Sequence, residues 1–310
     1  MQTNNHGKHK ESSGHQPVMP KQVIQFLNPA SGQLMLDCTI GRGGHAEQLI
    51  PLLGPGGRYL GLDVDPENVD FARNRLTGLA DRNEVELLIM QGNFRDAAER
   101  LQSGNRGKVD LLLADLGFAS NQMNNPARGL AFSTDGPLDM RLDPNLSMTA
   151  GDLVKTLSEK ELADLLYHFG EERLSKKIAR KIVAQRRQNP IVKTRQLAEL
   201  VRSCYGPRGH KMKIDPATRT FMALRIAVNG ELDALDRLLA DLPQLLAPGG
   251  RTVIISFHSL EDRQVKQVML AMEKCGKAKR LTRKPAVATS SEIAGNPRSR
   301  SAKLRAMLLH

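Results

Sequence analysis

The stretch DCTIGRGGH, residues 37–45, decides how this chain folds. A short apolar run at 33–38 leads into it, and a segment with helical apolar spacing, 46–53, follows it. Glycines between a strand and a helix let the backbone approach a ligand, and the first amides of the helix are free to bind it. The stretch therefore predicts a strand–loop–helix unit with a binding function.

The same alternation continues along the first hundred residues. Strands are predicted at 33–38, 58–62, 84–90 and 109–114, and helices at 46–53 and 66–76. Alternating strands and helices at this spacing indicate an α/β fold with a doubly wound, Rossmann-like parallel sheet.

An acid at the end of the second predicted strand narrows the choice of ligand. Asp63 follows the glycine loop by about twenty residues, where a carboxylate commonly holds ribose hydroxyls. Both NAD and S-adenosylmethionine fit a glycine loop followed by an acid at this spacing. The glycine spacing is G-x-G-G-H and not the G-x-G-x-x-G that seats a pyrophosphate, and an acid such as Asp37 before the loop is typical of methyltransferases. Two roles stay open for His45, which either contacts the amino-acid part of the cofactor or only opens the helix.

The fourth strand ends in Asp115-Leu116-Gly117-Phe118, at the edge where open α/β sheets place reacting groups. Methyltransferases that act on amino groups have an acid or amide, two tight-turn residues and an aromatic at this point. The amine of a base is a poor nucleophile, because its lone pair is delocalised into the ring. A carboxylate or carbonyl that accepts its N–H protons, with close positioning, favours attack on the sulfonium methyl. We therefore expect Asp115 and Phe118 to position the substrate.

Composition excludes several classes of protein. Hydrophobic residues are 40% and charged residues 25% of the 310, which is ordinary for a globular chain. The apolar runs are too short to span a bilayer, the N-terminus has no secretory pattern, and the three cysteines have no pair spacing. We expect a soluble, cytoplasmic protein without a metal site.

The net charge of +12 is concentrated in two segments. Residues 170–213 and 263–310 each carry about +10, so the rest of the chain is acidic. Clustered Lys and Arg displace counterions from phosphates, which favours a nucleic-acid partner over solvated helix faces alone.

A helical insert is predicted between the fourth strand and the next one. Its helices are expected after a capping box at Ser158, at 171–188, and at 195–204 with Thr194 as the cap; an exposed basic loop follows at 206–213. A helix at 231–246 then leads to a strand at 251–257. The predicted division is a methyltransferase domain at 15–123 and 221–310, an inserted helical substrate-recognition domain at 124–220, and a disordered segment at 1–14.

At this point the chain resembles the MraW family, the 16S rRNA cytidine-N4 methyltransferases also called ribosomal RNA small subunit methyltransferase H. The resemblance runs in family order through HQPVM (15–19), DCTIGRGGHAEQLI (37–50), DLGFASNQMNNPARGLAFSTDGPLDMRLD (115–143), DPATRTFMALRIAVNGEL (215–232), ISFHSLEDRQVK (255–266) and NPRSRSAKLRA (296–306). It departs from the family at Asp215, Ala119 and Leu130-Ala131, none of which lies in the glycine loop.

The resemblance implies a cofactor, a substrate and site residues. The family methylates N4 of a cytidine in the decoding region of 16S rRNA with S-adenosylmethionine. Its motifs place the cofactor contacts at Gly43, Gly44, His45, Asp63, Phe94, Asp115 and Gln122. The candidate substrate-binding residues are Arg128, Asp139, Arg141, Arg219, His258 and Ser259.

The expected mechanism is a single displacement without metal or covalent intermediate, on a base that is unstacked to reach the methyl group. No general base is assigned.

Three alternative functions stay open: a diverged paralogue acting on another RNA base, a non-catalytic rRNA-binding assembly factor, and a nicotinamide-dependent oxidoreductase. The glycine spacing and the basic insert disfavour the oxidoreductase. A hydrolase is rejected, because no G-x-S-x-G elbow accompanies His258 and Ser259.

Overall fold

The computed structural model describes residues 16–206, 212 and 214–310. The disorder predicted for 1–14 and most of the basic loop predicted at 206–213 therefore lie outside the described residues. None of the helices in the described part is long and apolar enough to cross a membrane.

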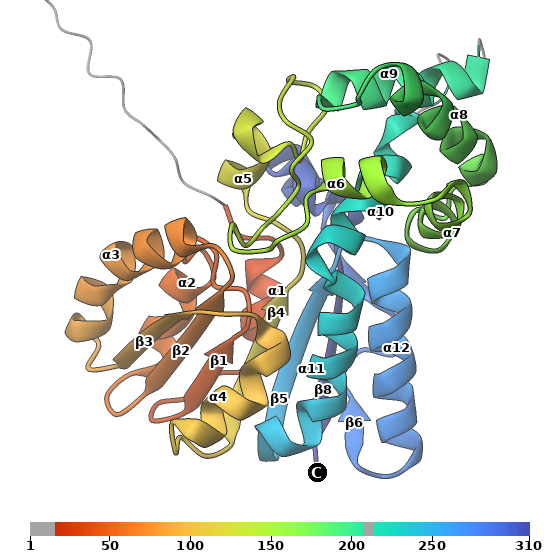
Figure 1. Ribbon diagram of the computed structural model, residues 1–310. Coiled ribbons are helices and arrows are strands. Elements are labelled where there is room, and N and C mark those ends of the chain that lie inside the picture. Colours follow the sequence, from red (N-terminus) through yellow and green to blue (C-terminus); the bar gives the residue numbers. More distant parts are fainter. Residues whose placement is uncertain (1–15, 207–211, 213) are drawn as a thin grey trace, which may run out of the picture.

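A single mixed sheet organises the larger half of the molecule (Figure 1). Its order is β3-β2-β1-β4-β5-β8-β6, with β7 paired to β8. The strands are β1 (Leu34–Asp37), β2 (Arg58–Asp63), β3 (Glu86–Gln91), β4 (Val109–Asp115), β5 (Leu246–Ser256), β6 (Ala278–Arg280), β7 (Ala286–Val287) and β8 (Lys303–Leu309). The first five are parallel, as predicted, whereas β8 runs antiparallel to both of its neighbours in the order.

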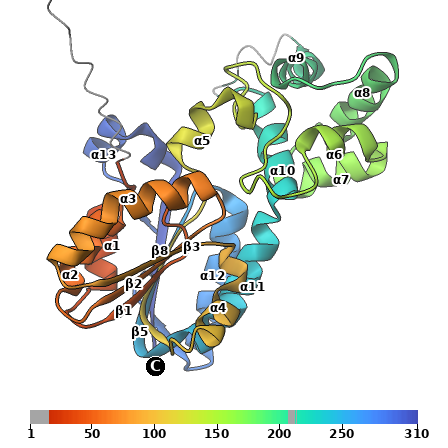
Figure 2. The same ribbon diagram turned by 60° about the vertical axis from the view of Figure 1, so that its left-hand side comes forward.

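Helices cover both faces of this sheet, which makes it doubly wound (Figure 2). One face packs α1 (Pro20–Leu27), α2 (Ala46–Leu53) and α3 (Pro66–Arg82); the other packs α4 (Ala97–Ser103), α11 (Glu231–Leu245) and α12 (Ser259–Lys274). Side chains alternate between the two cores along each strand: Met35 faces the first core, while Leu34 and Leu36 face the second. The apolar runs of the sequence are continuous because both faces are buried.

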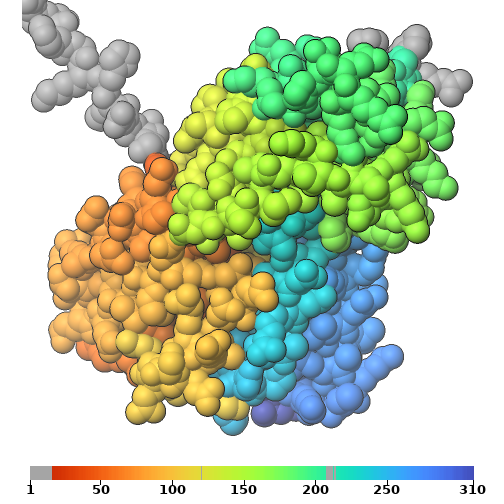
Figure 3. Space-filling view, in the orientation of Figure 1, coloured from red at the N-terminus to blue at the C-terminus, as the bar shows by residue number. Residues whose placement is uncertain are grey.

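A helical insert interrupts the chain between β4 and β5. It contains α5 (Ser120–Asn124), α6 (Ala150–Thr156), α7 (Glu159–Gly170), α8 (Ser175–Gln188), α9 (Thr194–Tyr205) and α10 (Ala217–Asn229). A third core, formed by side chains from Leu130 to Val228, holds α6 to α10 together. In the space-filling view this green and yellow-green part lies above the orange and blue parts of the chain (Figure 3).

Two predicted helix boundaries in the insert are wrong. The basic helix α8 begins at Ser175 and not at Glu171, because Glu171 adopts a left-handed conformation (φ 48°) that closes α7. Thr194 does not cap α9: it is the first helical residue, and its hydroxyl donates to the carbonyl of Thr134 and accepts from the amide of Gly136. The capping box at Ser158 is confirmed, with Glu161 as its partner.

Two other elements are longer than predicted. Helix α3 continues to Arg82, and β5 begins at Leu246 and runs through the turn-forming residues 248–250. The β4–β5 register is irregular at this point, which accommodates those residues within the strand.

Candidate active site

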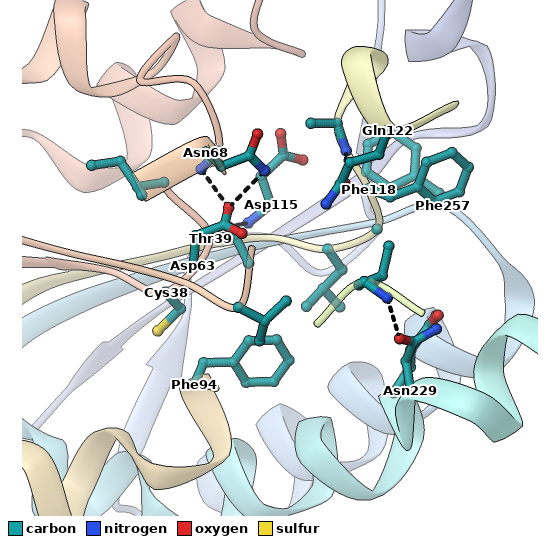
Figure 4. Close-up of a pocket in the computed structure, with 18 of the residues that line it drawn as sticks. Cys38, Thr39, Asp63, Asn68, Phe94, Asp115, Phe118, Gln122, Asn229 and Phe257 are labelled. Atoms are coloured by element: carbon teal, nitrogen blue, oxygen red, sulfur yellow. Dashed lines mark hydrogen bonds between the residues drawn. The ribbon is translucent and has the colours of Figure 1, made fainter. Parts of the chain in front are cut away.

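A cavity of about 430 Å³ opens at the carboxyl ends of the parallel strands (Figure 4). This is the edge at which open α/β sheets bind ligands. One end is formed by the glycine loop, the end of β2 and the first turn after β3; the other is formed by the segment after β4 and by residues of α10, α11 and α12. The sequence-predicted residues that line it are Gly44, His45, Asp63, Phe94, Asp115, Phe118, Gln122 and His258.

The glycine loop is shaped by backbone conformations that favour glycine. Gly41 and Gly43 have φ of 52° and 80°, in the left-handed region. Gly43 is not among the lining residues, and a Cβ there would lie 2.9 Å from the Leu76 side chain. Gly43 therefore lets the loop pack closely on α3, while Gly44 faces the cavity.

Asp63 joins the end of β2 to this loop. Its Oδ2 accepts hydrogen bonds from the Gly41 amide (2.9 Å) and the Asn68 side chain (3.3 Å), and its Oδ1 accepts from the Asp65 amide (2.8 Å). Burial raises the pKa of Asp63 to about 6, despite these hydrogen bonds. Each carboxylate oxygen has two acceptor sites, so the group retains capacity for a ligand hydroxyl.

Asp37 supports the loop from behind. It is fully buried, accepts from the Tyr59 hydroxyl (2.7 Å) and the Thr39 amide (3.0 Å), and does not line the cavity. Burial raises its pKa to about 6, and the Tyr59 hydrogen bond opposes that rise. Thr39 in turn accepts from the Asp115 amide (2.7 Å), which ties the loop to the end of β4.

His45 and Asp115 meet across the cavity. His45 Nε2 lies 3.4 Å from Asp115 Oδ2. Two buried polar atoms, His45 Nε2 and Asp115 Oδ1, have no hydrogen-bond partner in the described part of the chain. His45 stands at the start of α2 but makes no side-chain cap. Its ring therefore faces the cavity, which favours the contact role over helix opening.

Gln122 and Phe94 lie along the walls of the cavity. Gln122 is buried; its Oε1 accepts from the Ala119 amide (2.8 Å) and its Nε2 donates to Asp65 (2.8 Å). Gln122 therefore braces the segment after β4. Phe94 begins a short 3-10 helix after β3 and supplies an apolar surface on the side opposite Phe118 (Figure 4).

Most of the candidate substrate-binding residues do not line the cavity. Arg128 pairs with buried Asp65 (2.7 Å), and Arg141 binds Asp139 through two of its nitrogens (2.7 and 2.9 Å). These contacts hold the loop after β4 in place. Arg219 and Ser259 both contact Glu171, at 3.4 Å and 2.7 Å, where the insert meets α12.

Two charged residues of the cavity wall, Arg225 and Glu231, were not predicted from the sequence. Arg225 Nε and Nη2 each donate to a carboxylate oxygen of Glu231 at 2.7 Å, and the guanidinium lies 4.8 Å from the centroid of the Phe118 ring. Their only sequence signal is an Arg within the apolar run of α10 and a Glu six positions later.

Glu231, His258 and Glu261 offer ligand atoms within 4.8 Å of one another, the distance range of a metal site. The donor set is nevertheless poorly suited to a cation. Arg225 occupies both oxygens of Glu231, and His258 Nδ1 accepts the Glu261 amide (3.4 Å), which leaves the ring hydrogen on Nε2.

The departure from the family at Asp215 has a local explanation. Its carboxylate accepts from the Ala217 amide (2.8 Å) at the start of α10 and from two nitrogens of Arg202 (2.8 and 3.0 Å). The residue bonds the first amide of α10 and ties this helix to α9, so its contacts in this chain are structural.

Comparison with known proteins shows the family to which the chain belongs. A family model described as the MraW methylase family matches residues 12–308. The chain belongs to the MraW methylase family. The MraW relatives that it resembles include proteins from Acidobacterium capsulatum (45% identity, covering 96% of this chain and 98% of the relative), Desulfosudis oleivorans (42%, 94% and 97%) and Prochlorococcus marinus (48%, 94% and 88%). Each of these three is named ribosomal RNA small subunit methyltransferase H.

Similarity to solved structures is weaker. A putative rRNA-methylase from Clostridium thermocellum aligns with a TM-score of 0.44 and 11% identity, over 94% of this chain and 95% of that one. A likeness at this level carries no argument about function.

This MraW family member is an S-adenosylmethionine-dependent methyltransferase. The residues present fit that cofactor. The cavity offers a carboxylate at the end of β2, an apolar wall at Phe94, and two buried polar atoms without partners among the described residues, at His45 and Asp115. A ligand with a ribose, an adenine and a charged amino-acid group matches that set of surfaces.

Proposed function

We propose that this protein transfers a methyl group from S-adenosylmethionine to N4 of a cytidine in the decoding region of 16S rRNA. Support for the substrate comes from the relatives, which share 42–48% identity along nearly their whole length and are named for the small-subunit rRNA. The observation that carries the chemistry is Asp115: its buried Oδ1 has no partner among the described residues and faces the cavity beside Phe118.

We assign the cofactor to the glycine-loop end of the cavity. Asp63 accepts the ribose hydroxyls, Phe94 packs against the adenine, and Gly44 and His45 contact the amino-acid part. Gly43 and Gln122 act indirectly, because Gly43 packs on Leu76 and Gln122 is bonded at both ends of its amide. The bound cofactor supplies an electrophilic methyl on a sulfonium.

The target base occupies the other end of the cavity. Asp115 accepts an N–H of the exocyclic amine, which draws the lone pair out of the ring, and Phe118 lies against the base. The face of the Phe118 ring is fixed by the guanidinium of Arg225 above it. A base inside a folded RNA must be unstacked to enter this site.

We further propose that residues 124–220 form a substrate-recognition domain over the discontinuous methyltransferase domain at 15–123 and 221–310. The third core, and the insert residues Leu142, Asp143 and Leu146 that line the cavity, support this division. Helix α8 exposes Lys176, Arg180 and Arg187, a surface suited to phosphates.

The second basic segment contributes less than its charge suggests. Arg305 is buried and pairs with Asp262 (2.7 Å), Lys303 pairs with the same carboxylate (3.2 Å), and Arg280 pairs with Glu273 (2.6 Å). These three of the twelve Lys and Arg in 263–310 are paired within the protein, so the charge that this segment offers to RNA is smaller than its sequence count.

The test is methyl transfer by the purified protein from labelled S-adenosylmethionine to small ribosomal subunits that lack the modification. The expected product is N4-methylcytidine at one nucleotide. Label on a different base would identify a diverged paralogue, and binding to subunits without any label would identify a non-catalytic assembly factor.

A further inference from the structure

Two loops that leave neighbouring strands lie side by side at the substrate end of the cavity. Asp115 on β4 is the register partner of Ile255 on β5, and the Leu116 amide donates to the Ile255 carbonyl (2.9 Å). Phe118 and His258 each follow three residues after this pair. A Cβ on Gly117 would lie 3.6 Å from the Phe257 ring, so the two turns are in contact.

His258 presents a hydrogen-bond donor to the cavity. It is the N-cap of α12, and its Nδ1 accepts the Glu261 amide (3.4 Å). In a neutral imidazole one nitrogen accepts and the other carries the hydrogen, so the hydrogen is on Nε2. This Nε2 is buried and has no hydrogen-bond partner in the part of the chain that the structure describes.

The surroundings of His258 hold it in this state. Glu261 Oε1 lies 3.2 Å from Nε2, which favours the hydrogen there, but the N–H is not directed at that oxygen well enough to satisfy it. Burial opposes ionisation of Glu261, and its contact with His258 is the main reason that its pKa is nevertheless lowered. Glu261 Oε2 is engaged by the amides of Phe257 (2.9 Å) and His258 (3.2 Å). The ring is thus fixed by its own helix, with its donor left for a ligand.

The buried and unsatisfied atoms of the cavity therefore include an acceptor and a donor on neighbouring loops; two others, Arg42 Nε and His45 Nε2, belong to the glycine loop. Asp115 Oδ1 is an acceptor and His258 Nε2–H is a donor, on neighbouring loops that line one cavity. The Watson–Crick edge of cytosine has the complementary order, with the N4 amine as donor and the adjacent N3 as acceptor. Uracil reverses both groups, because it has a carbonyl at position 4 and a hydrogen on N3.

We infer that His258 donates a hydrogen bond from Nε2 to N3 of the target cytosine, and is the residue that selects cytosine over uracil. This role rests on the proposed function, which it deepens. Uracil would leave the donor of His258 opposed by another donor in a buried site. A site built to hydrogen-bond one polar group rejects analogues that cannot make the bond.

The test is a nucleoside titration with the full chain saturated with S-adenosylhomocysteine, followed by NMR. The three probes are cytidine, uridine and 3-deazacytidine, in which N3 is replaced by a C–H group. We expect the wild type to bind cytidine about tenfold more tightly than either other nucleoside, which corresponds to one hydrogen bond in a buried site.

The decisive variant is His258→Asn. Asparagine is among the best N-cap residues, so α12 keeps its cap, but the shorter amide does not reach the position of Nε2. We expect this variant to bind all three nucleosides within about twofold of one another, with unchanged affinity for S-adenosylhomocysteine. Ser158→Asn, which exchanges the exposed N-cap of α7, is the matched control and should keep the wild-type preference.

A wild type without preference for cytidine, including one that binds none of the three, would overturn the inference. So would a His258→Asn variant that still prefers cytidine over 3-deazacytidine. The titration contains no ribosomal RNA. The absence of a cytidine preference would therefore contradict the role of His258 but not the proposed rRNA substrate. Selective cytidine binding without methylation of small subunits would instead contradict the proposed function alone.

Discussion

His45 Nε2 lies 3.4 Å from Asp115 Oδ2, although the two residues are seventy positions apart in the chain. The contact joins the glycine loop after β1 to the end of β4, which are neighbouring strands in the centre of the sheet. It places the glycine loop, which we propose to hold the cofactor, in the same cavity as the proposed substrate-positioning carboxylate. The reacting groups are thus brought together by the strand order itself.

Asp115→Ala should abolish most of the methyl transfer. The variant loses the carboxylate that accepts the amine N–H, and a misplaced reactant commonly costs about 10²-fold in rate. Asp115→Asn keeps one acceptor oxygen and should retain more activity than Asp115→Ala. Single-turnover methylation of small subunits at saturating cofactor measures both. An alanine variant with the wild-type rate would remove Asp115 from the mechanism.

Cofactor affinity should depend on pH through Asp63. Burial raises its pKa to about 6, so the carboxylate takes up a proton as the pH falls through this value and loses acceptor capacity for ribose hydroxyls. The affinity for S-adenosylhomocysteine should be constant above about pH 7 and fall below about pH 6, approaching tenfold per pH unit. Calorimetric titration across pH 5–8 checks this.

The matched variants for that titration are Asp63→Asn and Asp236→Asn. Asp63→Asn should bind more weakly at neutral pH and show little pH dependence. Asp236, an exposed residue of α11, also has a raised pKa, because local desolvation and the nearby Asp233 carboxylate disfavour its charge; it does not line the cavity, so its variant should follow the wild-type profile. A steep profile that survives in Asp63→Asn would assign the dependence to another group.

Tyr59→Phe should destabilise the fold more at pH 8 than at pH 5. The Tyr59 hydroxyl donates to buried Asp37, whose folded-state pKa of about 6 exceeds its ordinary value. The folded state therefore binds more protons between about pH 4 and 6, and the free energy of unfolding falls as the pH rises through that window. Loss of the hydroxyl raises this pKa further.

The expected cost of Tyr59→Phe is about 1.5–3 kcal/mol at pH 8, where the bond is to a charged carboxylate, and about 1 kcal/mol at pH 5. Urea unfolding at the two pH values measures it. Tyr167→Phe is the control, since Tyr167 is 58% exposed, and should change little at either pH. Equal costs for Tyr59→Phe at both pH values would refute the coupling to Asp37.

The exposed cations of α8 should contribute to RNA binding without affecting the cofactor. Replacing Lys176, Arg180 and Arg187 by alanine should weaken binding to small-subunit rRNA. The slope of log affinity against log salt should become shallower by about 0.7–0.9 for each phosphate that the variant no longer neutralises. S-adenosylhomocysteine binding should not change. Arg82→Ala with Lys108→Ala, at the opposite edge of the sheet, is the control. An unchanged salt slope in the α8 variant would place the RNA elsewhere.

The sheet could be predicted because each of its early elements has a local signal. An apolar strand, a glycine loop and a helix start follow one another around DCTIGRGGH, and a strand followed by a helix start recurs at Arg58–Asp63 and Pro66–Arg82. The start of α8 could not be predicted in this way. Glu171 closes α7 because its carboxylate binds Ser259 and Arg263, which are 88 and 92 positions away, and this tertiary pairing overrides local helix propensity.

The site was predictable to the extent that its residues follow strands. Asp63 and Asp115 end strands, Phe118 and His258 follow strands within three residues, and His45 closes the glycine loop; all of them line the cavity. Arg225 and Glu231 could not be found, because the position of Arg225 over Phe118, and with it that of its partner Glu231, depends on how the insert packs on the sheet. Arg128, Asp139 and Arg141 belong to the loop after β4 that the sequence predicts to be functional, but they bond to other residues of the protein and do not line the cavity.

The central claim is that this chain methylates N4 of a cytidine in the decoding region of 16S rRNA. Mass-spectrometric nucleoside mapping of small-subunit rRNA, from cells with and without the protein, tests it most directly. We predict that N4-methylcytidine at one decoding-region position is lost when the protein is absent and restored by the wild type but not by Asp115→Ala. An unchanged level of N4-methylcytidine without the protein would contradict the claim.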